Sequence, residues 1–371
     1  MRIGIVSPYS LTVPGGVQAQ VLGLARELRR RGHEARVLGP CDGPPPESFV
    51  TPLGNSLPLG ANGSIAPLAP DPSAALRTLR VLADEEFDVL HLHEPLAPGP
   101  TSTALMVHSA PTVGTFHAAG ASTSYRMLRP ALTRLLRRID HKVVVSKDAL
   151  ALVQSSLGGE YEVLFNGVEL EAIRAVTPWA RTPSESSPRQ TVFFCGRHEE
   201  RKGLRVLVDA VRGADLDVAV WIGSDGPDTA ELTAVTAGDD RFQWLGRVTD
   251  GEKFARLRTA DVFCAPSLRG ESFGVVLIEA MAAGTAVVAS SLDGYRNVAT
   301  DGVDALLVEP GDAHALGEAL TRVLGDDELA GRLRRAGDTR AEQFAMTSLT
   351  DRYLEIYRSI CPSSNRPSGR P

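Results

Sequence analysis

Residues 260–290 read ADVFCAPSLRGESFGVVLIEAMAAGTAVVAS, and this stretch decides the fold. A short apolar run leads into a polar loop that contains glycine. An apolar segment of helical length follows, and a second short apolar run ends the stretch. Apolar runs on both sides of a helix are typical of parallel strands that are buried on both faces. The stretch therefore predicts a βαβ unit within a parallel sheet.

The loop and the helix of this stretch carry two carboxylates. Glu271 precedes the first helical turn, and Glu279 lies about two turns further on. The backbone N–H groups of Phe273, Gly274 and Val275 have no partner inside the helix, so they form a site for an anion such as a phosphate. The alternative interpretation is a capped, buried helix on which Glu279 is a surface charge.

The same alternation of strand and helix recurs on both sides of a polar segment that is rich in proline and serine, residues 177–190. Strands are expected at 3–6, 35–38, 88–93, 112–117, 142–146, 163–168, 192–195, 218–223, 242–246, 260–266, 285–290 and 305–308. Helices are expected at 17–28, 275–284, 313–324, 327–343 and 347–360. The fold class predicted is α/β, with two doubly wound, Rossmann-like domains that face a central cleft.

The domain boundaries follow from this pattern. We expect a first domain at 1–170 and a second at 171–346, with helix 347–360 packed back on the first domain and a disordered tail at 361–371. A chain of 371 residues is long enough for two cores.

Composition limits the classes of function. The net charge of −6 argues against general nucleic-acid binding, which favours a basic domain. The four cysteines have no metal or redox spacing. The N-terminal apolar run is too short for a signal peptide, and no stretch approaches the length of a membrane span. These features predict a reduced, cytoplasmic protein.

Three further patterns each allow two interpretations. His91 and His93 share a strand face and could suggest a metal site, but no third ligand is spaced to join them. The turn at Gly15-Gly16 lacks the G-x-G-x-x-G fingerprint, which disfavours a dinucleotide oxidoreductase.

Residues 125–140 form a basic amphipathic pattern. An ordinary solvated helix face is the favoured interpretation there, and contact with an anionic membrane is the alternative.

The charged residues of the second half describe a nucleotide-sugar site. Arg197 and Lys202 lie at a strand-to-helix turn, where two cations neutralise a diphosphate. Glu279 is suited to the two hydroxyls of a ribose, and Glu271 to the hydroxyls of the group on the far phosphate. Cleavage of the glycosidic bond then requires stabilisation of the leaving diphosphate. No metal or other cofactor is required by this chemistry, and Mg²⁺ stays possible.

The chain resembles the retaining GT-B glycosyltransferases of family four in the Gly15-Gly16 loop, the turn from Gly196-Arg197 to Lys202-Gly203, and the pair Glu271 and Glu279. Within that family the chain is most similar to the actinobacterial enzymes that mannosylate phosphatidylinositol, in the segments MRIGIVSPYS…VPGGVQ at the start, FDVLHLHEP at 87–95 and GESFGVVLIEAMAAGTAVVAS at 270–290. The resemblance implies transfer of mannose from GDP-mannose to the inositol ring with retention, by front-face attack. It also implies a cytoplasmic enzyme that is peripheral on the inner face of the membrane.

The resemblance further implies roles for individual residues. His117 and Glu271 are implied as catalytic, with His117 near the transferred sugar. The donor is expected to contact Gly16, Arg197, Lys202, Val248, Asp250, Lys253, Glu271, Ser272, Phe273, Gly274, Val275 and Glu279. The acceptor is expected near Tyr9, Thr12 and Gly15.

The chain departs from the family pattern on the acceptor side. Thr12 stands where those enzymes have aspartate, and their lysine-rich membrane helix is matched only by Arg77 and Arg80. Membrane contact through these two arginines or through helix 126–138 stays open. The alternatives are transfer from another nucleotide sugar or to another acceptor, such as inositol phosphate or a different glycolipid. Three alternatives belong to other classes of protein: a sugar-nucleotide epimerase, a phosphorylase and a non-catalytic binding protein.

Overall fold

A computed structural model describes residues 1–13, 15–61, 64–118, 125, 127–180, 189–271 and 273–361. The chain divides into two compact units, Met1–Gly167 with Met346–Pro371, and Val168–Ala345. The expected boundary after residue 170 lies close to this division. The central part of the expected linker, the expected tail from residue 362 on, and Ser272 lie outside the described residues.

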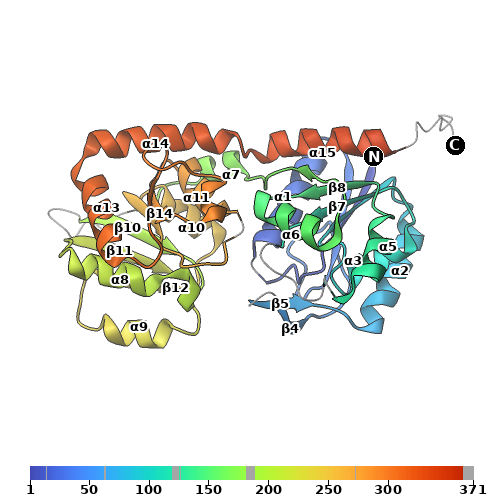
Figure 1. The fold of residues 1–371 in the computed structure, drawn as a ribbon, viewed down its shortest axis with the longest axis horizontal. Helices are drawn as coiled ribbons and strands as arrows, with labels where there is room; N and C mark the ends of the chain where they lie inside the picture. The colour runs from blue at the N-terminus through green and yellow to red at the C-terminus, as the bar shows by residue number, and fades with distance from the viewer. Residues whose placement is uncertain are drawn as a thin grey trace. The chain divides into compact units, whose positions relative to one another are not determined.

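In its described residues the first unit contains a parallel sheet with the order β3-β2-β1-β6-β7-β8-β9, of which Figure 1 labels β7 and β8. Its strands are β1 (Arg2–Val6), β2 (Glu34–Gly39), β3 (Val50–Pro52), β6 (Val89–His93), β7 (Thr112–Phe116), β8 (His141–Val144) and β9 (Glu162–Val163). A separate antiparallel hairpin is formed by β4 (Leu57–Ala61) and β5 (Ser64–Leu68). The strand order reverses at β1, which lies between β2 and β6. Ligands of doubly wound sheets bind at the carboxyl ends of the strands at such a reversal.

Helices cover both faces of this sheet. Ile3 and Ile5 of β1 pack with α1 (Gly16–Arg30) and α15 (Met346–Ile360), whereas Val6 belongs to the core on the other face. Successive side chains of a strand point to opposite faces, so β1 is buried on both faces from Ile3 to Val6. The core with Val6 includes residues of α2 (Pro72–Glu85), α3 (Pro100–Val107), α5 (Arg129–Leu136) and α6 (Lys147–Leu157).

Two expected elements of the first unit differ in part from the prediction. The amphipathic helix expected at 125–140, with a split near Pro130, is interrupted at Leu128, which is 56% exposed: Tyr125 and Met127 are helical, and α5 covers Arg129–Leu136. Pro130 lies in the first turn of α5, where the missing N–H is tolerated, so the helix begins there. Of the strand and turn expected at 163–168, the strand β9 ends at Val163, and the side chain of Gln20 binds both backbone groups of Gly167.

In its described residues the second unit contains a parallel sheet with the order β12-β11-β10-β13-β14-β15. The strands are β10 (Gln190–Cys195), β11 (Val218–Gly223), β12 (Phe242–Gly246), β13 (Val262–Ala265), β14 (Ala286–Ser290) and β15 (Leu306–Val308). The helices are α7 (Leu170–Ala175), η1 (Glu200–Lys202), α8 (Leu204–Gly213), α9 (Thr229–Val235), α10 (Asp250–Leu257), α11 (Val275–Ala282), α12 (Asp293–Arg296), α13 (Ala313–Gly325) and α14 (Asp327–Glu342). Here the strand order reverses at β10, which lies between β11 and β13.

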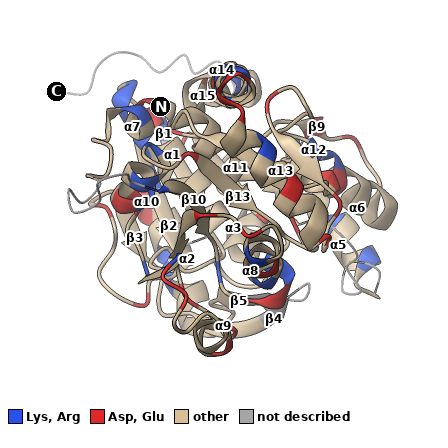
Figure 2. Ribbon diagram, turned by 90° about the vertical axis from the view of Figure 1, so that its left-hand side faces the viewer, with Lys and Arg blue, Asp and Glu red and all other residues tan. Residues whose placement is uncertain are grey.

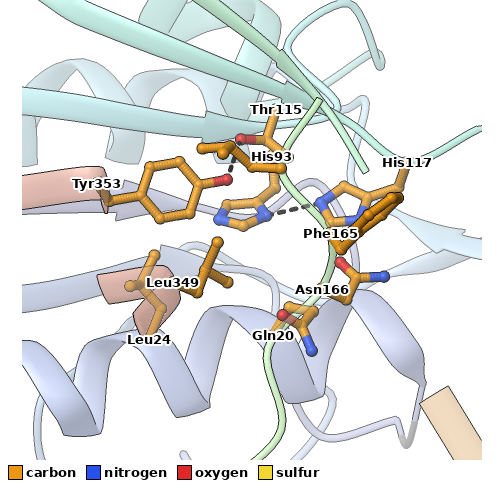
Figure 3. A pocket seen from close by; sticks show the side chains of 10 residues that line it. Gln20, Leu24, His93, Thr115, His117, Phe165, Asn166, Leu349 and Tyr353 are labelled. Atoms are coloured by element: carbon orange, nitrogen blue, oxygen red, sulfur yellow. Dashed lines mark hydrogen bonds between the residues drawn. The ribbon is translucent and has the colours of Figure 1, made fainter. Parts of the chain in front are cut away.

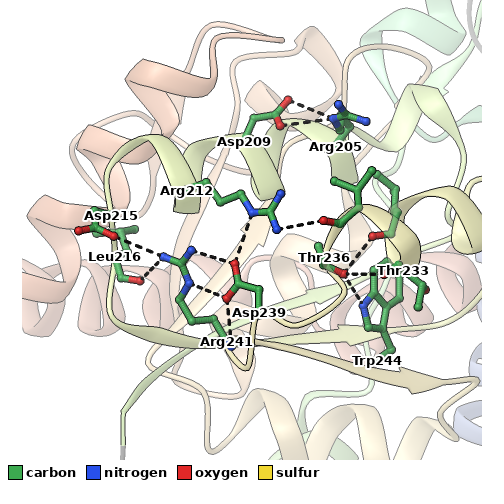
Figure 4. A network of polar contacts seen from close by, with 12 residues as sticks. Arg205, Asp209, Arg212, Asp215, Leu216, Thr233, Thr236, Asp239, Arg241 and Trp244 are labelled. Carbon is green, nitrogen blue, oxygen red and sulfur yellow. Dashed lines mark hydrogen bonds and ion pairs between the residues drawn. The ribbon is translucent and has the colours of Figure 1, made fainter.

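Charges of both signs are mixed on the surface of this second unit, as on α8 (Figure 2). Arg212 of α8 and Arg241 both donate to Asp239, and Arg205 pairs with Asp209 along the helix (Figure 4). The hydrogen bonds from Arg241 lower the pKa of Asp239 to about 2. These charges neutralise one another and tie α8 to the loop before β12, so we assign them a structural role.

Candidate functional site

Two loops meet at the reversal of strand order in the second unit. One follows β10 and passes through η1, and the other follows β13 and leads to α11. The N–H of Leu268 donates to the carbonyl oxygen of Arg201 over 2.7 Å. Gly203 has a φ of 68°, and a Cβ there would lie 1.9 Å from the carbonyl oxygen of Pro266. Only glycine allows this close approach, which brings Lys202 beside the loop that holds Glu271.

Glu271 accepts two hydrogen bonds on one oxygen. Its Oε1 lies 2.5 Å from Nζ of Lys202 and 3.0 Å from Oγ of Ser267. Ser267 in turn bonds the hydroxyl of Tyr295 over 2.9 Å. Burial raises the pKa of Tyr295, so this hydroxyl stays neutral. The expected donor residues Lys202 and Glu271 are therefore in contact, and Ser267 and Tyr295 hold the carboxylate in place.

The helix start next to this carboxylate has the geometry expected of an anion site. Gly274 precedes α11 with a φ of 95°, and α11 begins at Val275 without an acidic side chain in its first turn. Phe273 is buried and its ring contacts that of Phe344. The first N–H groups of α11 therefore lie close in sequence to Glu271. No acidic side chain in the first turn of the helix accepts hydrogen bonds from them.

Glu279 is not a surface charge, and that interpretation is wrong. Its side chain is 13% exposed and accepts from Nζ of Lys253 over 2.9 Å. Lys253 also lies 3.3 Å from Asp250. Burial by itself would lower the pKa of Lys253, but the attraction of Glu279 and Asp250 outweighs it and the pKa is raised. Lys253 is therefore charged, and the charges of this pair act on Cys195 at the end of β10.

The remaining expected donor residues of this unit lie around these two pairs. Asp250 and Lys253 lie on α10 rather than in a loop, because Thr249 caps that helix at its N-terminus. Val248 is half-buried just before this cap. Arg197 is half exposed and pairs with Glu199 over 3.6 Å.

The first unit gathers a second group of buried polar residues at the carboxyl ends of β6 and β7. Nδ1 of His93 lies 2.8 Å from Nε2 of His117, and the two rings point toward one another (Figure 3). Oε1 of Glu94 accepts from the N–H groups of His117 and Ala118, over 2.6 and 2.5 Å. Burial lowers the pKa of His117 to about 3 and raises that of Glu94 to about 7. Sequence reasoning identified His117 but missed both of its partners.

The residues expected at the acceptor also belong to the first unit. Tyr9 follows β1 and forms an isolated backbone bridge with Leu68. Burial raises the pKa of Tyr9, and the charge of Glu94 adds to this effect. The hydroxyl of Thr12 accepts from the N–H of Asp42 over 2.9 Å. Gly15 is the N-cap residue of α1, and Gly16 is its first residue.

The metal interpretation of His91 and His93 does not fit the structure. Nδ1 of His91 lies 2.7 Å from the hydroxyl of Tyr357, and its Nε2 lies 2.7 Å from that of Thr115. Both nitrogens of His91 are therefore engaged. Among the described residues, no group of three histidine, cysteine or acidic side chains is arranged to hold a metal ion. In the same part of the chain, no helix combines the length and the apolar character of a membrane span.

Two family models match the chain. The model described as Glycosyltransferase Family 4 matches residues 14–172, and that described as Glycosyl transferases group 1 matches residues 189–326. The phosphatidyl-myo-inositol mannosyltransferase of Mycobacterium leprae is 39% identical over 99% of this chain and 99% of its own length. The enzyme of the same name from Mycolicibacterium smegmatis is 38% identical over 97% of this chain and 94% of its own.

Solved structures with the same fold are more distant in sequence. A glycosyltransferase from Rickettsia africae has a TM-score of 0.74 at 19% identity and covers 98% of this chain and 99% of its own. The sucrose-phosphate synthase of Thermosynechococcus elongatus has a TM-score of 0.75 at 20% identity, over 98% and 100% of the two chains. At this identity the likeness concerns the fold alone, which is the GT-B fold with two Rossmann-like sheets.

Proposed function

The chain belongs to the glycosyltransferase family that includes the mycobacterial phosphatidyl-myo-inositol mannosyltransferases, and we propose that it transfers mannose from GDP-mannose to the inositol ring of phosphatidylinositol with retention of configuration. The observation that carries this proposal is the identity of 38–39% over nearly the full length of relatives with that name. The relatives match both compact units, so the likeness spans the parts of the chain in which the donor and the acceptor residues are expected.

The charges at the carboxyl ends of β10 and β13 support a nucleotide-sugar donor. Lys202 and the first N–H groups of α11 supply positive charge for a diphosphate, and Arg197 lies on the same loop as Lys202. Glu279 is suited to accept two ribose hydroxyls, since it is held in place by Lys253. Glu271 is suited to accept from hydroxyls of the sugar.

The proposed reaction needs little acid–base chemistry from the protein. The bond between the anomeric carbon and the diphosphate breaks, and its electron pair stays on the phosphate oxygen. The inositol hydroxyl attacks from the same face and passes its proton to that oxygen. Charge therefore develops on the leaving diphosphate, where Lys202 and the start of α11 stabilise it most. Glu271 orients the sugar during this exchange.

Transfer is tested directly with radiolabelled donors. The protein is incubated with GDP-mannose or UDP-glucose, each with and without phosphatidylinositol in detergent micelles, and labelled lipid is separated from free sugar. We expect labelled lipid only from GDP-mannose with phosphatidylinositol, and an α-linked product by NMR. Label on inositol phosphate would point to another acceptor of the same family. Conversion of the donor sugar without any acceptor would instead show an epimerase.

Substitutions test the donor site. Glu271→Ala removes the carboxylate that Lys202 and Ser267 hold, and should abolish transfer. Lys202→Ala should raise the KM for the donor about 10-fold or more, since a charge-assisted bond to phosphate contributes about 1.5–3 kcal/mol. Arg205→Ala is the matched control, because it removes an exposed cation three positions further along. Normal transfer by both site variants would refute the assignment.

Peripheral contact with the inner face of the membrane is part of this proposal. Leu76 and Leu79 of α2 are exposed, by 66% and 41%, and the side chain of Arg80 is 84% exposed beside them. An apolar stripe with a neighbouring cation is typical of helices that lie on anionic membranes. Arg77 is held by Ser73 and by the backbone of Leu53, so it is less available.

Sedimentation with vesicles tests this contact. The protein should bind vesicles that contain anionic lipid and release at high salt, and Leu76→Asp should weaken binding more than a change on α5, such as Arg134→Ala. The reverse order would assign the contact to helix 126–138, which the sequence left open. No binding at low salt would refute peripheral association.

A further inference from the structure

His93 lies between two other buried histidines at the end of β6. It is 2% exposed, its ring stacks on that of His91 at 4.4 Å between centroids, and its edge meets the edge of the His117 ring at 5.1 Å between centroids. His91 is fixed on its other side by Tyr357 of α15 and by Thr115 of β7. The ring of His93 therefore has little freedom to rotate.

The bond between His93 and His117 joins two neutral rings. Burial lowers the pKa of both imidazoles well below physiological pH. A neutral imidazole has one N–H and one bare nitrogen. One ring must therefore donate and the other accept, so the tautomer of His93 dictates the tautomer of His117.

The other nitrogen of His93 shows which ring donates. In the described part of the structure, Nε2 of His93 is buried and has no hydrogen-bond partner. Buried N–H groups without an acceptor are rarer than buried acceptors without a donor. With its proton on Nδ1, His93 donates to Nε2 of His117, and this arrangement leaves no N–H of His93 without a protein acceptor. His117 then carries its own proton on Nδ1.

We propose that His93 is a positioning residue, which holds His117 in the Nδ1–H tautomer so that this N–H can donate to an oxygen of the transferred sugar. The inference rests on the proposed function, because it takes His117 to lie by that sugar. Glu94, the next residue along the chain, holds the backbone of His117 and Ala118 through its Oε1. Two consecutive residues at the end of β6 thus fix both the ring and the backbone of His117.

A cavity beside the pair separates this arrangement from an ordinary packed core. His93, His117, Thr115 and Tyr353 line a small cavity together with Asn166 (Figure 3). Its free volume of about 10 Å³ is close to the minimum for one water molecule. The pair is therefore shielded from bulk water, and a hydrogen bond between neutral groups gains strength in such surroundings.

Two variants of His93 and one control test the kinetic role. His93→Leu removes the donor and should lower kcat about 10- to 100-fold, in line with the effect of a misplaced catalytic group. His93→Asn keeps an N–H near the position of Nδ1 and should restore part of this loss. Tyr357→Phe removes a bond of His91 at similar burial but leaves the contact with His117, so kcat should stay within about twofold.

A double substitution shows whether His93 acts through His117. If it does, adding His93→Leu to His117→Ala should change kcat by less than about twofold, because the contact is already lost. Two effects that multiply would overturn the proposal. Full activity of His117→Ala would instead refute the placement of His117 at the sugar, which belongs to the proposed function.

The tautomer is measured without any assay of transfer. In protein labelled with ¹⁵N-histidine, long-range ¹H–¹⁵N correlation spectra should show His117 of the wild type as the Nδ1–H form. His93→Asn should keep that form, and His93→Leu should give a mixture. An Nε2–H form of His117 in the wild type, or an unchanged spectrum in His93→Leu, would overturn the inference.

Discussion

Glu94 offers a quantitative test of the buried polar group in the first unit. It is 4% exposed, and burial raises its pKa from 4.5 to about 7. The unfolded chain releases the proton above pH 4.5, while the folded chain keeps it up to about pH 7. The folded state thus binds more protons in this window, so the free energy of unfolding falls as the pH rises.

The substitution Glu94→Gln isolates this effect. The Gln carbonyl oxygen can accept the same two N–H groups, from His117 and Ala118, but it does not titrate. A difference of 2.5 pH units corresponds to about 3 kcal/mol. Between pH 5 and pH 8 we expect the variant to gain about 2.5 kcal/mol relative to the wild type, which is roughly a 70-fold change in an equilibrium constant.

Native-state hydrogen exchange is the suitable assay. The three tryptophans, Trp179, Trp221 and Trp244, all lie in the second unit, so their fluorescence does not report on β6 and β7. The ratio of protection factors between variant and wild type is measured for peptides of these two strands at each pH. The effect of pH on intrinsic exchange and the titration of the neighbouring histidines are the same in both proteins, so they cancel in this ratio.

Asp42→Asn provides the control for this experiment. Burial raises the pKa of Asp42, but hydrogen bonds from Ser10 and Ser56 outweigh it and the pKa is lowered. Asp42 is thus ionised in both states between pH 5 and pH 8, and its ratio should not change with pH. If the ratio for Glu94→Gln is equally flat, Glu94 is ionised in the folded protein, and the argument from burial is wrong.

Two further predictions concern the second unit. In Gly274→Ala the new Cβ would lie 2.8 Å from Cδ1 of Tyr295, at a φ of 95°. We expect a loss of about 1–3 kcal/mol in urea unfolding followed by tryptophan fluorescence, and a higher donor KM. Lys253→Met leaves the carboxylate of Glu279 without its partner. It should destabilise the unit by about 3 kcal/mol and weaken GDP binding in calorimetry, and Lys253→Arg should restore most of both losses.

The sheets and the positions of the charged residues at the expected donor site were predictable because their signals are local. Arg197 and Lys202 lie in the loop and the short helix η1 that follow the apolar run of β10, and Glu271 and Glu279 flank a helix start that the sequence marks with Phe273-Gly274. Strand ends and helix starts can be recognised within a few residues. That these charged residues lie near one another was expected from the general rule that ligands bind where the strand order reverses.

The partners of these residues depend on contacts that the sequence does not encode locally. His93 was considered only as a metal ligand. Its bond to His117 depends on the parallel register of β6 and β7, in which His93 lies beside Thr115 and His117 follows two residues later on the same face. That register is set by packing on both faces of the sheet. Ser267 and Tyr295 likewise meet 28 residues apart along the chain, without a motif to mark them.

The contact between Lys202 and Glu271 bears on how the proposed donor site distinguishes its ligands. A lysine ammonium has three donors, so Lys202 can bind a phosphate oxygen while it keeps its bond to Glu271. A diphosphate alone shares this cation with the carboxylate and brings no hydroxyl from which Glu271 could accept a hydrogen bond. A nucleotide sugar brings hydroxyl donors that satisfy Glu271 as the cation is shared. Under the proposed function, this pair would therefore favour the intact donor over the product nucleotide, and release of the product nucleotide would be easier.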